Sequence, residues 1–86
     1  MPISEDVTWK NIIKMLREFS GKTQENFARE IGVRTDSVSR WERGNSNPGR
    51  LATRNIIKYY FLHKTGLTEK YMKIIEDFLE RNDLLK

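Results

Sequence analysis

The first apolar residues of the chain have a helical spacing. Trp9, Ile12, Ile13, Leu16 and Phe19 recur at intervals of three and four residues. An α-helix makes one turn in about 3.6 residues, so this spacing places them on one stripe. The pattern predicts a helix over about residues 5 to 20 whose apolar stripe faces a core.

Two shorter helices are predicted next, separated by a glycine. Residues 23 to 31 form the first, with Thr23 as the cap that accepts from backbone N–H groups one turn later. Gly32 ends this helix, because glycine is favoured just past a helix end. Residues 35 to 43 form the second, with Thr35 as its expected cap.

The helix over residues 35 to 43 carries little apolar surface. Only Val38 and Trp41 are expected to point inward, three residues apart, with Glu42 beside Val38. We therefore expect this helix to lie mostly on the outside of the domain.

The last two helices are predicted on either side of Gly66. Apolar and aromatic side chains between residues 56 and 62 cover nearly the whole circumference of the helix over about residues 50 to 64, which is more than one core contact needs. The helix over about residues 68 to 82, opened by Thr68, has an apolar stripe of Tyr71, Ile74, Ile75, Phe78 and Leu79. We expect this stripe to cover the end of the preceding helix, in the same chain or from a second copy, and to contribute to dimerisation.

The fold class predicted from these patterns is all-α, with five helices. The chain has 86 residues, too few for a second independent core, so we expect residues 1 to 86 to form a single domain with a core over about residues 5 to 64. Tyr59, Tyr60 and Phe61 either lie beneath the last helix or form a patch that binds a partner, and the sequence leaves both open.

The composition limits the kinds of functional site that the protein can have. The chain has no cysteine and one histidine, His63, which excludes a disulfide framework, a thiolate metal site and structural zinc. No convergent acids or nucleophiles suggest an enzyme, and no cofactor is expected. The N-terminus carries acids where a signal peptide needs positive charge, and no apolar run is long enough to span a bilayer, so we expect a cytoplasmic protein without a membrane partner.

The positive charge is unevenly placed. The net charge is +4, and through residue 64 there are 12 Lys and Arg against 7 Asp and Glu. An excess of this kind suggests that the body of the protein meets an anion. The alternative, that the charge only keeps the chain in solution, stays open on charge alone.

The segment TQENFAREIGVRTDSVSRWERG, residues 23 to 44, has the layout of a helix-turn-helix. Its second helix presents Asp36, Arg40 and Arg43 opposite the apolar side, with Ser39 next to them. Such a polar stripe suits the major groove of DNA. Hydrogen-bond donors that suit phosphates surround the stripe: Gln24, Arg34, Asn45 and Arg50.

Residues 12 to 62 resemble the lambda-repressor-like, Cro or Xre-type helix-turn-helix family. The matching positions are Arg17 in the first helix, Thr23 and Gln24 at the start of the second, Ala28 in its middle, Gly32 and Val33 in the turn, and VSRWERG followed by Pro48. The combination is specific, because these positions keep a fixed register.

The resemblance implies double-stranded DNA as the partner. It assigns base reading to Thr35, Asp36, Ser39 and Arg40, and phosphate contacts to Gln24, Arg34, Arg43 and Asn45. It also implies an ion pair between Arg17 and Glu42 that ties the first helix to the base-reading helix. The expected protein is a homodimeric repressor or autoregulator of transcription.

Two departures from the family pattern keep alternatives open. The segment GRLATRNIIKYY lacks the early leucines usual in the fourth helix and is similar to a branch that includes many antitoxins, so the protein could instead bind a toxin and regulate its own promoter. Asp36 places a carboxylate near the phosphates. It either accepts from a cytosine amino group, orients Arg40, or only interacts with the helix dipole.

Overall fold

The computed structural model describes residues 7–85, and its helices follow the predicted order. The elements are α1 (Trp9–Phe19), α2 (Gln24–Ile31), α3 (Thr35–Glu42), α4 (Arg50–His63), a 3-10 turn η2 (Lys64–Gly66) and α5 (Glu69–Arg81). The prediction of an all-α fold with five α-helices is confirmed over the described residues. Residues 5 and 6, which the first predicted helix included, lie outside this range.

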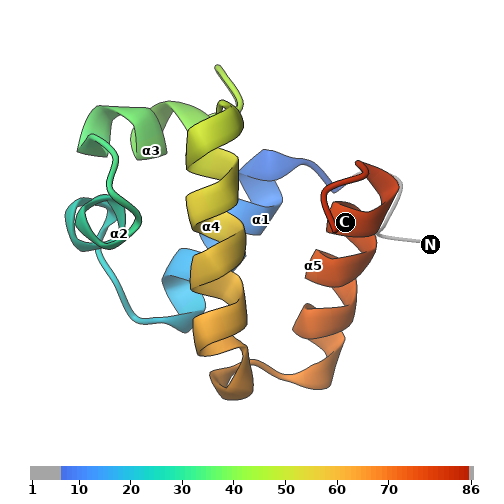
Figure 1. Cartoon of the computed structure of the whole chain (residues 1–86). Coiled ribbons are helices and arrows are strands. Elements are labelled where there is room, and N and C mark those ends of the chain that lie inside the picture. Colours follow the sequence, from blue (N-terminus) through green and yellow to red (C-terminus); the bar gives the residue numbers. More distant parts are fainter. Residues whose placement is uncertain (1–6, 86) are drawn as a thin grey trace.

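Helix α4 crosses the middle of the molecule in Figure 1. α2 and α3 lie on one side of it, α5 on the other, and α1 behind it (Figure 1). The described N-terminal end and the C-terminal end lie on the α5 side, away from the α2–α3 pair. The helix-turn-helix is therefore at one end of the molecule, with α3 at the outer edge.

Capping explains where two of the helices begin. The Thr23 hydroxyl accepts from the Asn26 N–H at 3.1 Å before α2, and the Thr68 hydroxyl accepts from the Tyr71 N–H at 3.4 Å before α5. Gly32 ends α2 with φ +75°, a left-handed conformation that glycine adopts at little cost. These three predictions are confirmed.

The predicted cap of α3 is wrong. Arg34 occupies the cap position with an extended backbone, and its carbonyl accepts from the N–H groups of Ser37 and Val38. Thr35 is the first residue inside the helix, and no side chain caps the start of α3. The helix thus begins one residue earlier than it would with Thr35 as its cap, and Thr35 is exposed on the first turn.

All five α-helices contribute to one core. Burying a large apolar side chain stabilises a fold by about 1.5–3 kcal/mol. The buried apolar residues are Ile12, Ile13, Leu16, Phe27, Ala28, Ile31, Val38, Trp41, Ile56, Tyr59, Tyr60, Ile75, Phe78 and Leu79.

Helix α5 packs inside the chain. The Phe78 ring meets Trp9 of α1 edge to face, with centroids 5.0 Å apart, and the Tyr60 hydroxyl of α4 donates to Glu76 Oε2 at 2.6 Å. Ile75, Phe78 and Leu79 are buried in this packing. The chain's own helices already cover these three side chains and leave them little surface for a dimer contact, and their part in a dimer interface stays a prediction. Tyr71 and Ile74 are only partly buried.

The end of α4 is covered on one side only. Tyr60 is buried against α5, whereas Phe61 is 45% and Leu62 77% exposed. The expectation that α5 covers this whole end is wrong for these two residues. Leu62 lies about 200° around the helix from Tyr60, so one packed helix cannot cover both.

Candidate nucleic-acid interface

Helix α3 presents its polar side to solvent. Val38 and Trp41 are buried and hold its inner side in the core, whereas Asp36 and Arg40 are exposed and Ser39 is partly exposed. Thr35 is exposed at the start of the helix. The structure thus brings all four predicted base-reading residues to the outward side of one short helix.

An ion pair joins two of these residues. Arg40 Nη1 lies 3.9 Å from Asp36 Oδ2, one turn earlier on α3, with side chains 50% and 65% exposed. Exposed pairs of this spacing contribute only about 0.3–0.5 kcal/mol. The pair biases Arg40 toward the N-terminal half of α3 without fixing it there.

A buried carboxylate anchors α3 from behind. Glu42 is 5% exposed. It accepts from Arg17 Nε at 2.6 Å and Nη2 at 3.0 Å, and from Gln24 Nε2 at 3.1 Å. Arg17 Nη1 also donates to the Lys22 carbonyl at 3.0 Å. The ion pair that the resemblance implied is present, and it joins α1, α2 and α3.

The hydrogen bonds of this network favour the charged form of the arginine. Donation to Glu42 raises the pKa of Arg17, although burial works in the opposite direction. A charge pair of this kind is costly to break, since removing one partner leaves the other buried without compensation.

Gln24 makes a hydrogen bond within the protein that the sequence did not predict. Its amide nitrogen donates to Glu42, and the side chain is partly buried. A primary amide has two N–H groups, so one remains for a phosphate. The predicted phosphate contact by Gln24 stays a prediction, with the amide already oriented by Glu42.

The other predicted phosphate-binding residues surround α3. Arg34, Arg43, Asn45 and Arg50 are exposed. Arg34 precedes α3, Arg43 and Asn45 follow it, and Arg50 is the first residue of α4. The structure therefore places hydrogen-bond donors before and after α3.

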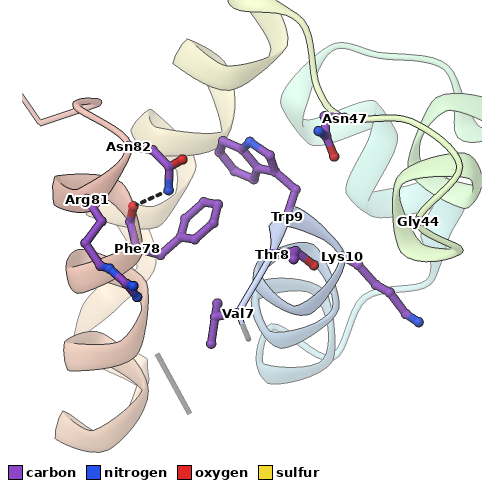
Figure 2. Close-up of a pocket in the computed structure, with 9 residues that line it drawn as sticks. All are labelled: Val7, Thr8, Trp9, Lys10, Gly44, Asn47, Phe78, Arg81 and Asn82. Carbon is purple, nitrogen blue, oxygen red and sulfur yellow. Dashed lines mark hydrogen bonds between the residues drawn. The ribbon is translucent and has the colours of Figure 1, made fainter. Parts of the chain in front are cut away.

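Lys10 adds a cation that sequence reasoning missed. A Cβ atom built on Gly44 would lie 3.6 Å from Lys10 Cδ, so this lysine lies against the loop that follows α3. Figure 2 shows its side chain extending on the Gly44 side of the pocket, away from Phe78. The sequence signal that could have identified Lys10 was its position in the first turn of α1, next to Trp9 and on the polar side of the helix.

The pocket in Figure 2 lies between the start of α1, the loop after α3 and the end of α5. Its aromatic wall consists of Trp9 and Phe78, and Asn82 donates to the Phe78 carbonyl at 2.8 Å.

Among residues 7–85, no group of three or more His, Asp or Glu side chains could hold a metal ion. In the same part of the chain, no helix is long and apolar enough to cross a membrane.

Comparison with known proteins gives one match. A family model described as Helix-turn-helix matches residues 13–60, more than half of the chain. The match begins within α1 and ends within α4, and so includes α2, α3 and the turn between them. No curated protein and no solved structure matches the chain.

Proposed function

Since this chain belongs to the lambda-repressor-like helix-turn-helix family of DNA-binding regulators, we propose that it is a repressor or autoregulator that binds one specific DNA sequence as a homodimer. The observation that carries the proposal is the outward side of α3. Hydrogen-bonding side chains cover that side, while Val38 and Trp41 fix the opposite side in the core.

In this proposal α3 enters the major groove. Arg40, in the middle of the exposed side, donates two hydrogen bonds to a guanine, the commonest base-specific contact of arginine. Thr35 and Ser39 contact neighbouring base edges. Asp36 orients Arg40 through the pair at 3.9 Å, and it accepts from a cytosine amino group where the sequence offers one.

The donors around α3 bind phosphates and set the position of the helix. They are Gln24, Arg34, Arg43, Asn45 and Arg50, and we add Lys10, because it lies against the loop after α3. Phosphate contacts carry most of the affinity, whereas base contacts carry the sequence preference.

A homodimer would place two copies of α3 in successive turns of the major groove. The dimer surface must lie outside the buried part of α5. We assign it to Tyr71 and Ile74, which are partly exposed, together with Phe19, whose ring packs on Tyr71 with centroids 4.4 Å apart.

Selection of bound sequences from random double-stranded DNA tests this proposal, run beside a mass measurement in solution. We expect two inverted half-sites about one helical turn apart, a dimer, and binding that weakens steeply as salt rises, because each phosphate contact releases counterions. Failure to select any site, or binding insensitive to salt, would contradict the proposal.

A second role is supported by a separate observation. Leu51, Phe61 and Leu62 leave large apolar surface exposed on α4. An antitoxin needs such a surface to bind its toxin, while the α2–α3 motif regulates the promoter. We propose this protein-binding role as an addition to DNA binding, and the two are compatible because they use different helices.

A further inference from the structure

One side of α4 has no covering element. We call the α4 outer face the side chains of Leu51, Arg54, Lys58, Phe61 and Leu62, which recur at helical spacing along α4. Leu51 is 70% exposed, and Arg54 and Lys58 are exposed. The five residues line one groove together with Asn55, Ile57 and Leu84.

The charge on this face has a single sign. No Asp or Glu occurs between Arg43 and Thr68 in the sequence. Within residues 7–85, neither Arg54 nor Lys58 forms an ion pair, whereas Arg17, Lys22, Arg40 and Lys64 each have a carboxylate partner. The α4 outer face is thus cationic in its middle and apolar at both ends.

This arrangement does not suit a second copy of the chain. A two-fold interface brings the same face of each copy together. In an antiparallel pairing of two α4 helices, Leu51 could meet Leu62 of the partner. Arg54 and Lys58 would then lie beside the same two cations of the second copy, with no carboxylate to pair with them. Like charges placed together in an interface are destabilising.

The face is also a poor match for DNA. Phosphates and base edges are bound by hydrogen-bond donors and acceptors, and the exposed leucines at its two ends offer none. Their exposed apolar surface gains free energy only when another apolar surface excludes water from it.

We propose that the α4 outer face is a docking site for an acidic amphipathic helix of another protein. The inference rests on the protein-binding role proposed above and specifies the partner's chemistry. Leu51 and Leu62 are eleven residues apart, about 16 Å along the helix, which matches about three turns of a partner helix. Apolar residues on one side of that helix would contact Leu51, Phe61 and Leu62, as in other helix-in-groove complexes. Its flanking carboxylates would pair with Arg54 and Lys58.

Two synthetic helical peptides test the proposal. Both are about five turns long with leucines along one side, and they differ only in carrying glutamates or lysines beside the leucines. Titrated into the isotope-labelled full chain and followed by NMR, the glutamate peptide should shift signals along the α4 outer face and bind at least tenfold more tightly than the lysine peptide. Shifts centred on Arg40 and Arg43 would overturn the proposal, because they would show only general attraction to basic surface.

Charge reversal gives the sharper comparison. Arg54→Glu with Lys58→Glu should invert the preference, so that the lysine peptide binds more tightly. Lys70→Glu with Lys73→Glu makes the same change in net charge on exposed positions of α5 and should leave the preference for glutamate intact. An equal loss of preference in both double variants would overturn the proposal.

DNA binding and self-association are measured on the same variants. The Arg54 and Lys58 double variant should bind a selected DNA site within threefold of the Lys70 and Lys73 variant, and Leu62→Glu should leave the mass in solution unchanged. A specific loss of DNA binding, or dissociation of a dimer by Leu62→Glu, would assign the face to DNA or to a second copy. If no DNA site can be selected but the peptide preference inverts as stated, the regulator proposal fails while the docking site stands.

Discussion

The outward side of α3 and the α4 outer face both carry exposed cations, but these cations have different surroundings. On α3, Arg40 lies among Ser39, Asp36 and Thr35, and none of the large exposed apolar residues belongs to this helix. On α4, Arg54 and Lys58 lie between exposed leucines without a single acid.

The difference shows that positive charge alone does not identify a DNA-binding surface. Base edges and phosphates require donors and acceptors held in a fixed geometry. Helix α3 has such support, because the buried Glu42 joins it to α1 and α2. The α4 outer face instead combines charge with apolar surface, which suits another protein. Each of the following variants alters one of these two regions, or the packing beneath it, and the measurement shows whether the other region changes.

Removing α5 should have the largest effect. A chain that ends at Gly66 loses the buried side chains of Ile75, Phe78 and Leu79, which together stabilise the fold by roughly 5–9 kcal/mol. That is comparable to the whole stability of a small domain, about 5–15 kcal/mol. We expect a product that aggregates and binds DNA weakly, measured by thermal melting and light scattering. A chain ending at Leu84 is the control. A well-behaved product of the shorter truncation would show that α5 is not part of the core.

Substitution of Glu42, which anchors α3, should have the second largest effect. Glu42→Ala leaves Arg17 without its buried partner, a loss of roughly 3–5 kcal/mol when burial is complete and less here, because the Arg17 side chain is 19% exposed. The melting temperature should fall far more than for Glu80→Ala on the exposed side of α5. DNA affinity should fall with it, whereas the preference of the α4 outer face for the glutamate peptide should persist while the chain is folded. Similar melting temperatures for the two variants would contradict this account of the anchor.

Substitutions of the proposed base-reading residues should have different effects from substitutions of the proposed phosphate-binding residues. Arg40→Ala should remove roughly 1–3 kcal/mol of discrimination at one position in each half-site and spare non-specific binding. Arg43→Ala, at the end of α3, should weaken all sequences alike and reduce the salt slope by about 1. Binding to matched sites and to sites with one base changed measures both effects. Identical behaviour of the two variants would mean that α3 has a different orientation in the groove.

The smallest effect concerns the contact that holds α5 against α4. The hydrogen bond from the Tyr60 hydroxyl lowers the pKa of Glu76 below its usual value, and Lys64 adds to this. A lowered pKa means that the charged carboxylate stabilises the folded state above the unfolded pKa, and that this contribution is lost as pH falls through the folded pKa.

Glu76→Gln should therefore reduce stability modestly at neutral pH, and the difference from the natural chain should disappear in acid. Denaturant unfolding at several pH values measures it, with Glu80→Gln as the matched control. DNA binding should not change. A stability difference that persists in acid would mean that packing, and not the charge of Glu76, is responsible.

Most of the fold could be predicted from the sequence because its signals are local. The spacing of Ile12, Ile13 and Leu16 fixed the buried side of α1, and Gly32 marked the end of α2. Thr35 misled the prediction of the α3 cap, since a capping residue type does not show whether the backbone at that position is extended or helical.

What the sequence could not predict depends on contacts between distant residues. The stripe of α5 showed that Ile75, Phe78 and Leu79 are buried, but not whether by the same chain or by a second copy. The Trp9–Phe78 contact, 69 positions apart, shows that the chain's own α1 helps to cover them. Likewise, the bond from Gln24 to Glu42 and the place of Lys10 beside Gly44 follow from how the helices pack.

An NMR titration of the full chain with a selected DNA duplex tests the central claim most directly. The account predicts that backbone signals from Arg34 to Asn45 shift strongly, with those of Gln24 and Arg50, while Lys58, Phe61 and Leu62 stay unchanged. Strong shifts along the α4 outer face, with α3 unaffected, would contradict the assignment of DNA reading to α3.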